Sequence, residues 1–346
     1  MAESTGTPPS HTGAYGPDAA AWLAHLEARL LRIAQAENPF VTEAAQHVLA
    51  AGGKRLRPLL VELASQLGGG DVDDEKLDAA ALVVELTHVA SLYHDDVMDE
   101  AVLRRGVAST NARYGNSVAI LTGDYLFARA SSLVATLGVA YVHRQADTFA
   151  RMVQGQIAEL KGPMAGADPM DHYLKVLSDK TAALIATSAV FGGMVGGLED
   201  DDLARLDRFG EALGMAFQLH DDLLDITSDT AGKLPGTDLR QGVATLPLLL
   251  LRRSTRPDDQ ALVASIGHGM TDAEVAAAVA ALRVHPVIDQ ARDVIAGYTT
   301  AADAELAALP ESSAKAKLVA LVADVTGRLN GGGGADRPQG GRVRIA

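Results

Sequence analysis

Apolar residues recur at three- and four-residue spacing from Ala19 to about Arg328, which is the periodicity of helices that bury one face. Short segments rich in Gly, Pro and Asp separate these runs. The clearest breaks fall at residues 68–71, 162–168, 196–202 and 227–242. No run alternates convincingly as a strand, and no break is long enough to be a linker between domains. The pattern therefore predicts one continuous all-α domain of roughly ten or more helices.

The two ends of the chain lack this pattern. Residues 1–18 are rich in Ser, Thr, Gly and Pro and have neither the basic start nor the apolar core of a secretory signal, so we expect a disordered tail. Residues 329–346 contain two runs of glycine, and we expect a flexible tail there as well. The folded domain is accordingly expected to span residues 19–328.

Residues 181–198 are the nearest candidate for a membrane span, because 18 consecutive residues carry no charge. The segment also contains Thr181, Thr187, Ser188 and four glycines, which fit hydrocarbon poorly. A buried core helix is the better interpretation. We therefore expect a cytoplasmic protein with no integral membrane association.

Composition narrows the chemistry that the chain can perform. Of its 346 residues, 48% are apolar and 21% are charged, which is enough to bury a large core. The 44 acidic residues exceed the 30 basic ones, and the net charge of −14 disfavours nucleic acid as a partner. There is no cysteine, which excludes disulfides, thiolate nucleophiles and Cys-type zinc sites. A metal would have to sit on oxygen or imidazole.

Two aspartate motifs of the form D-D-x-x-D lie inside apolar helical runs, at residues 94–99 (HDDVMD) and 220–225 (HDDLLD). Each residue turns a helix by ~100°, so the first and last aspartates of a motif share one face. Adjacent carboxylates need a counter-charge, and neither motif has a basic residue within four positions. Oxygen ligands suit Mg²⁺, with Mn²⁺ as the other option, better than zinc. The candidate metal ligands are Asp95, Asp96, Asp99, Asp221, Asp222 and Asp225.

Basic residues stand near both motifs. Residues 52–58 (GGKRLRP) place three cations in four positions after a glycine pair, an arrangement that can cradle phosphate, although a solvated loop explains this segment equally well by itself. Arg104 and Arg105 follow the first motif, Lys180 opens the uncharged segment, and Lys233 follows the second motif. This arrangement suits two diphosphates, only one of which needs metal.

Neutral side chains continue the two aspartate faces. Gln218 stands three residues before Asp221, and His88 stands seven residues before Asp95. Between His88 and the first motif, the small residues Ala90 and Ser91 leave space where bulky side chains would form a floor. We therefore expect a pocket below the first motif.

These segments together resemble the trans-type polyprenyl (isoprenyl) diphosphate synthases, from about Ala19 to Arg328. The resemblance also includes Lys180-Thr181 and the loop of residues 232–239 (GKLPGTDL), closing with residues 245–247 (TLP). It implies an all-α, single-domain helical bundle of the isoprenoid synthase type with a deep central cavity. Members of this family are usually homodimers.

The resemblance also implies a role for each candidate residue. Asp95, Asp99 and Asp221 would be the principal Mg²⁺ ligands, supported by Asp96, Asp222 and Asp225. The diphosphate of isopentenyl diphosphate would be held by Lys54, Arg57, His88 and Arg105. The allylic diphosphate would be held by Arg104, Lys180 and Lys233, while Thr181 and Gln218 would present oxygens to the carbocation.

The implied reaction condenses an allylic diphosphate repeatedly with isopentenyl diphosphate and releases pyrophosphate. Shorter-chain members of the family often carry bulky aromatics where this chain has Ala90 and Ser91, and many carry a second lysine at Thr237. We therefore expect a medium or long product, longer than the twenty-carbon geranylgeranyl diphosphate, with geranylgeranyl diphosphate as the alternative. Ala90→Phe is expected to shorten the products.

Three other functions would use parts of the same pattern. A metal phosphohydrolase of the His-Asp type would need imidazole ligands, but His94 lies ~100° from Asp95 around the helix, so both cannot easily share one metal. A non-catalytic subunit of a heteromeric synthase would be expected to lack one motif or the basic segment, and here all are present. A class I terpene cyclase needs only one diphosphate site, whereas the basic segment at residues 52–58 argues for two.

Overall fold

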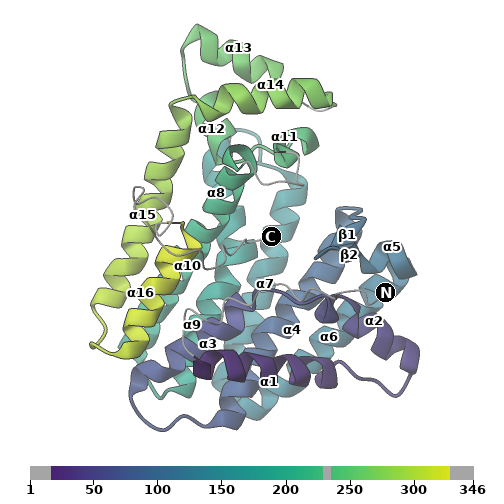
Figure 1. Cartoon of the computed structure of the whole chain (residues 1–346), viewed down its shortest axis with the longest axis vertical. Helices are drawn as coiled ribbons and strands as arrows, with labels where there is room; N and C mark the ends of the chain where they lie inside the picture. Colours follow the sequence, from purple (N-terminus) through teal and green to yellow (C-terminus); the bar gives the residue numbers. More distant parts are fainter. Residues whose placement is uncertain (1–16, 229–234, 268, 328–346) are drawn as a thin grey trace, which may run out of the picture.

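The computed structural model describes residues 17–228, 235–267 and 269–327. The prediction of an all-α fold is confirmed, and Figure 1 shows a bundle of long helices with a group of shorter ones at one end. The two expected tails lie outside the described residues, except that Pro17 and Asp18 begin the first helix. Lys233 also lies outside them.

The helices on the side of the first aspartate motif come from the first half of the chain. They are α1 (Pro17–Ile33), α2 (Pro39–Ala50), α3 (Leu56–Ser65), α4 (Asp74–Met98), α5 (Thr110–Tyr114), α6 (Asn116–Leu137) and α7 (Val139–Lys161), with the 3-10 turn η2 (Gln66–Gly68) after α3. α4 begins where the Asp73 side chain accepts hydrogen bonds from the backbone N–H groups of Glu75 and Lys76. It ends at the first motif.

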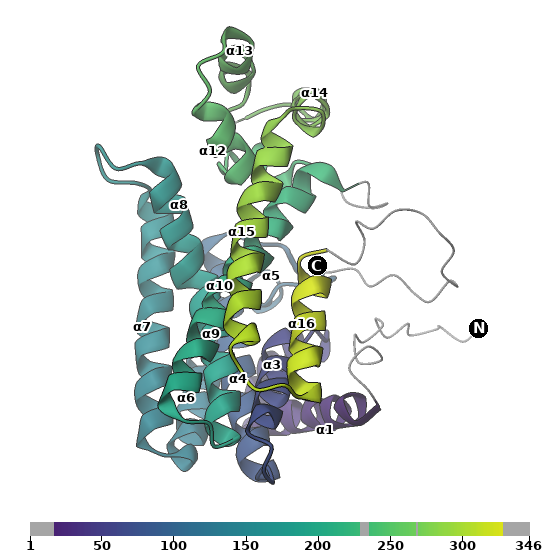
Figure 2. The ribbon, with the colours of Figure 1, turned by 90° about the vertical axis from the view of Figure 1, so that its left-hand side faces the viewer.

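The second half continues with α8 (Pro169–Leu177), the π-helical turn η3 (Ser178–Ala182), α9 (Ala183–Val195) and α10 (Asp200–Thr227). Beyond the second motif come α11 (Thr237–Gln241), α12 (Leu246–Arg252), α13 (Pro257–Ser265), α14 (Asp272–Arg283), α15 (Val287–Ala307) and α16 (Ser313–Val325). Figure 2 shows α12, α13 and α14 at one end of the bundle, with α15 running back along α10.

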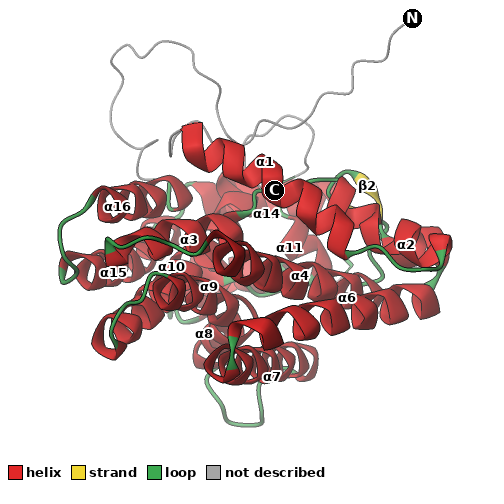
Figure 3. Cartoon of the chain, turned by 90° about the horizontal axis from the view of Figure 1, so that it is seen from below, coloured by secondary structure: helices red, strands yellow, loops and turns green. Residues whose placement is uncertain are grey.

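The uncharged segment forms a core helix, as predicted. Every residue of α9 from 183 to 193 is buried, and α9 contacts α3, α4, α7 and α10 (Figure 3). Two glycines allow this close packing, because a Cβ on Gly192 or Gly196 would lie 2.3 Å from a backbone oxygen of α3 or of the residue that ends it. The free energy gained by burying α9 therefore depends on small residues at its contact with α3.

Two apolar clusters form the core, and α10 and α15 contribute to both of them. The larger cluster lies among α1, α3, α4, α6, α9, α10 and α16, and the smaller one lies among α10, α12, α14 and α15. Because the same two helices run through both clusters, they form one continuous body.

Two features were not predicted. A short antiparallel hairpin of β1 (Leu103–Arg104) and β2 (Val107–Ala108) follows α4, and its turn places Arg105 and Gly106 at positive φ. Within the described ranges, α6 is the one helix long and apolar enough to cross a membrane by length and composition alone, and 33% of that apolar window is buried in the structure. Core helices of soluble proteins pass the same test.

Candidate active site

A cavity of about 1800 Å³ lies between the two aspartate motifs. Its wall is formed by residues of α1, α3, α4, α6, α7, η3 and α10, with the β1–β2 hairpin and the glycine-containing loop before α3. Its charged side chains come mainly from α4, α10, η3, the β1–β2 hairpin and that loop, whereas α6 and α7 contribute mainly apolar side chains.

The first motif occupies the last turn of α4, and its three aspartates have different surroundings. Asp95 lines the cavity, whereas Asp96 is fully buried and accepts a hydrogen bond from Arg104 Nε at 2.7 Å. Burial raises the pKa of Asp95 to about 6, and Asp99 and Glu159 add to the shift while Lys180 opposes it. The pKa of Asp99 is also raised by burial. This end of α4 therefore favours a bound cation.

The second motif lies near the end of α10 and shows the same division. Asp221 lines the cavity, while Asp222 is buried and accepts hydrogen bonds from the Tyr173 hydroxyl and from Gln218 Nε2. Burial raises the pKa of Asp222 to about 6. Asp225 accepts hydrogen bonds from the backbone N–H groups of Thr237 and Asp238 at the start of α11, at 3.2 and 3.1 Å. In each motif the second aspartate is thus held by side chains of the protein.

Asp238, on α11, was not predicted as part of this cluster. Burial raises its pKa to about 7, with further contributions from Asp225, Asp222 and Asp221. Each of these three carboxylates raises the pKa of Asp238, as expected for like charges placed close together. Its sequence signal was the loop of residues 232–239, in which Asp238 is the acidic residue.

The donor set fits a hard divalent cation. Buried carboxylates with raised pKa values gain from a nearby positive charge, and Asp96 Oδ2 is buried without a hydrogen-bond partner in the described part of the chain. Among the described residues, no three His, Asp or Glu side chains already converge on a single point. One aspartate of each motif, Asp95 and Asp221, lines the same cavity.

The basic segment before α3 is divided between binding and support. Lys54 and Arg57 line the cavity, and Lys54 Nζ lies 5.7 Å from the centre of the Phe217 ring. Arg55 also lines the cavity, but it is only 4% exposed and its backbone has a positive φ. Its guanidinium donates hydrogen bonds to Glu27 of α1 at 2.6 Å and to Glu85 of α4 at 2.5 Å. Arg55 therefore ties the segment to two helices.

Glu85 was not predicted and lies beneath the basic segment, 2% exposed. Burial opposes its ionisation, but Arg55, Arg105 and Arg57 hold the pKa of the Glu85 carboxyl below its usual range. Burial lowers the pKa of Arg57 to about 10. Burial, followed by Arg57 and Arg105, lowers the pKa of His88 well below its ordinary value. His88 is therefore a neutral hydrogen-bonding group in the cavity wall.

Arg105 approaches the same place from the β1–β2 turn. Its Nη1 donates to the backbone oxygen of Gly52, and its Nη2 lies 3.8 Å from Glu85 Oε1. A Cβ on Gly53 would lie 2.9 Å from the Arg105 guanidinium carbon, so the glycine leaves space for this side chain. The structure thus brings together Lys54, Arg57, His88 and Arg105, as the resemblance implied.

Lys180 and Thr181 face the cavity from η3. Lys180 Nζ donates to Glu159 of α7, and Thr181 Oγ1 lies 3.5 Å from Gln218 Oε1. Neither Glu159 nor Gln156 was predicted from the sequence. Gln156 is 9% exposed, and its two side-chain polar atoms have no hydrogen-bond partner within the described ranges. The three-residue spacing of these two residues on α7 was the available signal.

The apolar part of the cavity is lined by Ser91 and Leu92 of α4 and by side chains that include Phe127 and Phe149. The rings of Phe127 and Phe149 are 4.3 Å apart. Ala90, expected in the floor with Ser91, does not line the cavity. It is fully buried, and its backbone oxygen lies 3.2 Å from a Cβ placed on Gly123 of α6. Of these two small residues, therefore, only Ser91 leaves space in the cavity wall.

The two histidines of the motifs contact other parts of the protein. His94 Nε2 lies 3.0 Å from the Ile120 backbone oxygen and 3.5 Å from Asp124 of α6. His220 stands beside Gly327, where an added Cβ would lie 2.9 Å from the imidazole. Neither imidazole is placed with the motif aspartates around a common point, so the His-Asp phosphohydrolase alternative has no support in this geometry.

An all-helical bundle with two aspartate motifs and a basic segment around one cavity is an isoprenoid synthase fold. The family model for polyprenyl synthetase matches residues 38–282, and the chain belongs to this family. The expectations of an all-α fold and of a prenyl-transferring enzyme are therefore confirmed.

Relatives of this chain include proteins with products of different lengths. It is 47% identical over 285 residues to the nonaprenyl diphosphate synthase of Mycobacterium tuberculosis (strain ATCC 25618 / H37Rv). The matched region covers 82% of this chain and 85% of that protein. A decaprenyl diphosphate synthase from Rhodobacter capsulatus has a TM-score of 0.83 and 31% identity, covering 92% and 99% of the two chains.

A third relative is the geranylgeranyl pyrophosphate synthase from Corynebacterium glutamicum, solved with calcium and isoprenyl diphosphate. Its TM-score is 0.80 and its identity 39%, with 90% of this chain and 98% of that chain covered. Divalent metal and isoprenyl diphosphate thus occur together in a protein of this fold.

Proposed function

We propose that the chain condenses an allylic diphosphate repeatedly with isopentenyl diphosphate, giving a trans-polyprenyl diphosphate longer than geranylgeranyl diphosphate. The observation that supports this most directly is that one cavity of about 1800 Å³ is lined both by charged residues of the two motifs and the basic segment and by many apolar side chains. Such a cavity can hold two diphosphates beside a growing hydrocarbon chain.

We assign the principal metal positions to Asp95, Asp99 and Asp221, with Asp96, Asp222 and Asp225 as supporting residues. When bound, Mg²⁺, or Mn²⁺ in its place, would neutralise the diphosphate that leaves the allylic substrate. The calcium in the Corynebacterium glutamicum structure supports a divalent ion with oxygen ligands. Chelation should abolish turnover, and Mg²⁺ should restore it.

Protein side chains hold the two substrates on either side of the reacting carbons. Lys54, Arg57, Arg105 and neutral His88 bind isopentenyl diphosphate. Lys180, Arg104 and Lys233 bind the allylic diphosphate, although Arg104 is paired with Asp96 in this structure and Lys233 lies outside the described residues. This separation places the double bond of one substrate next to the allylic carbon of the other.

The reaction then needs no side-chain base. The allylic C–O bond breaks with its electron pair going to the diphosphate, and the double bond of isopentenyl diphosphate attacks the cation. The new cation loses a proton to the released pyrophosphate and regains a double bond. The oxygens of Thr181, Gln218 and Gln156 face the cation, and the apolar wall keeps water from quenching it.

Product length rests on Ser91 and on the relatives. The similarity to a nonaprenyl and a decaprenyl synthase favours a long product, while the Corynebacterium glutamicum structure keeps geranylgeranyl diphosphate as the alternative. Incubation with labelled isopentenyl diphosphate, Mg²⁺ and an allylic primer, followed by sizing of the dephosphorylated products, tests the proposal. Products no longer than twenty carbons would support the alternative.

We also propose a cytoplasmic homodimer formed through α6 and α7. Leu121 of α6 is 66% exposed, Val139 and Val142 of α7 are also exposed, and none of these three side chains lines the cavity. Asp124 lies on α6 close to Leu121 with a side chain 59% exposed, which suits a protein contact better than lipid. In analytical ultracentrifugation the wild type should have the mass of a dimer and Leu121→Glu the mass of a monomer. The same mass for the wild type and the variant would contradict the proposal.

A further inference from the structure

Lys180 and Thr181 stand on a π-helical turn rather than on a regular α-helix. This turn, η3, joins α8 directly to α9. π-turns are rare and are frequently found at functional sites. An unfavourable backbone conformation of this kind persists only where surrounding contacts hold it. Whatever holds η3 in this conformation therefore also sets the direction of two side chains that face the cavity.

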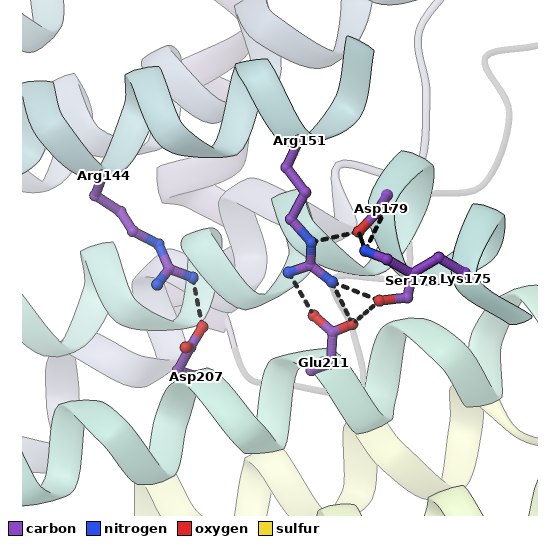
Figure 4. Close-up of polar contacts among 7 residues, drawn as sticks. All are labelled: Arg144, Arg151, Lys175, Ser178, Asp179, Asp207 and Glu211. Atoms are coloured by element: carbon purple, nitrogen blue, oxygen red, sulfur yellow. Dashed lines mark hydrogen bonds and ion pairs between the residues drawn. The ribbon is translucent and has the colours of Figure 1, made fainter. Parts of the chain in front are cut away.

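Arg151 of α7 makes the contacts that hold the first half of this turn. Its Nε donates to Asp179 Oδ1 at 2.7 Å, and its Nη2 donates to Ser178 Oγ and, at 2.7 Å, to Glu211 Oε1. Nη1 donates to Glu211 Oε2 at 3.1 Å. Figure 4 shows the guanidinium between η3 and the carboxylate of Glu211 on α10. One rigid group thus joins α7, η3 and α10.

The charges in this cluster balance. Asp179, which is 6% exposed, and Glu211 are matched by Arg151 and by Lys175, whose Nζ donates to Asp179 at 2.5 and 2.6 Å. Lys175 contacts Asp179 alone, and its side chain is 66% exposed. Only the forked guanidinium reaches both carboxylates and the Ser178 hydroxyl, which a lysine could not do at once.

Three residues of α7 meet the π-turn in succession. Arg151, Gly155 and Glu159 are four residues apart and so lie on one face of the helix. A Cβ on Gly155 would lie 2.8 Å from the backbone nitrogen of Lys180, so the glycine lets the turn approach. Glu159 then accepts a hydrogen bond from Lys180 Nζ. One face of α7 therefore supports the turn from its start to the lysine.

We infer that Arg151 is a positioning residue: it holds Ser178, Asp179 and Glu211, and thereby fixes the π-turn that directs Lys180 and Thr181 into the cavity. Arg151 is not part of the cavity wall. The inference rests on the proposed function, which gives Lys180 and Thr181 their roles toward the allylic substrate.

The test compares Arg151→Gln with the matched control Arg144→Gln. Arg144 also lies on α7, donates to Thr187 Oγ1 of α9 at 2.9 Å and pairs with Asp207 of α10, but it does not contact η3 (Figure 4). Two measurements are made on the full-length proteins. The first is kcat with the KM of each substrate, and the second is amide hydrogen exchange of residues 178–182 without substrate.

Arg151→Gln should lower kcat by about ten- to a hundredfold, because a small displacement of Lys180 and Thr181 misaligns the allylic substrate. The KM for isopentenyl diphosphate should stay within about twofold, since its binding residues lie elsewhere. Residues 178–182 should exchange faster. Arg144→Gln should retain kcat within about threefold and leave exchange at 178–182 unchanged.

The inference is overturned if Arg151→Gln behaves as Arg144→Gln does, or if exchange at residues 178–182 is unchanged. If Arg151→Gln does not fold, Ser178→Ala decides instead, because it removes only the hydroxyl between Arg151 and Glu211. It should show the same changes to a smaller extent, and their absence counts against the inference. If the wild-type protein forms no polyprenyl product, the proposed function fails, while hydrogen exchange still shows whether Arg151 holds the turn.

Discussion

Glu85→Gln tests whether the basic segment is assembled around a buried carboxylate. In the wild type, one oxygen of Glu85 accepts from Arg55 at 2.5 Å and lies 3.8 Å from Arg105, and Arg57 is close enough to influence its pKa. The amide has nearly the same shape but no charge. The variant therefore leaves three guanidinium groups together without the anion that lies between them.

The expected loss in the free energy of unfolding is about 3 kcal/mol. Breaking a buried ion pair costs about 3–5 kcal/mol, and the lower end applies because the amide oxygen can still accept from Arg55. For a chain of this size the loss corresponds to a fall in Tm of about 4–5 °C, because the entropy of unfolding is about 2.1 cal/mol/K per residue. Glu27→Gln is the matched control, since Glu27 contacts the same Arg55 with a side chain 39% exposed. It should cost less than about 1 kcal/mol.

Thermal unfolding should be measured with and without inorganic pyrophosphate, in the presence of EDTA. Pyrophosphate supplies the negative charge that Glu85→Gln lacks, so it should raise the Tm of this variant more than that of the wild type. The folded-state pKa of Glu85 is depressed, so its contribution is present above the unfolded pKa of about 4.3 and is lost as the pH falls below it. The difference between the two proteins should therefore shrink in acid. Equal losses for Glu85→Gln and Glu27→Gln, or equal pyrophosphate shifts, would refute the reasoning.

Three further variants test other parts of the structure. Ser91→Phe should shorten the products by about one or more prenyl units, measured by chromatography of the dephosphorylated chains, because a ring would fill the cavity wall. Asp221→Asn should lower Mg²⁺-dependent turnover by about a hundredfold or more in a steady-state assay. Gly192→Ala should lower the free energy of unfolding by about 1–3 kcal/mol, measured by thermal unfolding, because the added methyl group clashes with α3. Gly297 of α15 is exposed and has open space around it, so Gly297→Ala should raise the free energy of unfolding by about 0.5–1 kcal/mol.

Each of these expectations has a contrary result. An unchanged product distribution for Ser91→Phe would remove Ser91 from the determinants of length. Full activity of Asp221→Asn at low Mg²⁺ would place the metal elsewhere. Equal melting temperatures for the two glycine variants would show that α9 and α3 can separate without cost.

The sequence was sufficient for features that depend on local spacing. The two aspartate faces follow from the constant rotation per residue of a helix, and the core position of residues 181–198 follows from the absence of charge over a long segment. The glycine pair before Lys54 likewise predicted a turn, and Gly52 has a positive φ there. These inferences need no knowledge of which helices are neighbours.

Features that depend on distant contacts were not predictable in the same way. Asp96 and Asp95 look alike in the sequence, yet only the structure shows that Arg104 holds Asp96. Arg55 looks like Arg57, but its partners lie 28 and 30 residues away on α1 and α4. Ala90 and Ser91 are adjacent, and the position of α6 decides which of them lines the cavity. Each choice is set by packing between helices.

Under the proposed assignment of the two substrates, the charges around the cavity account for a metal requirement at one diphosphate and not at the other. In the site that we propose for isopentenyl diphosphate, Arg55, Arg57 and Arg105 outnumber Glu27 and Glu85 by one, even before Lys54 is counted. At the first aspartate motif the balance is reversed, because four carboxylates face two cations. The carboxylates are Asp95, Asp96, Asp99 and Glu159, and the cations are Arg104 and Lys180. A diphosphate is repelled there until added cations exceed the remaining charge, so protein side chains suffice for one substrate while the other requires metal.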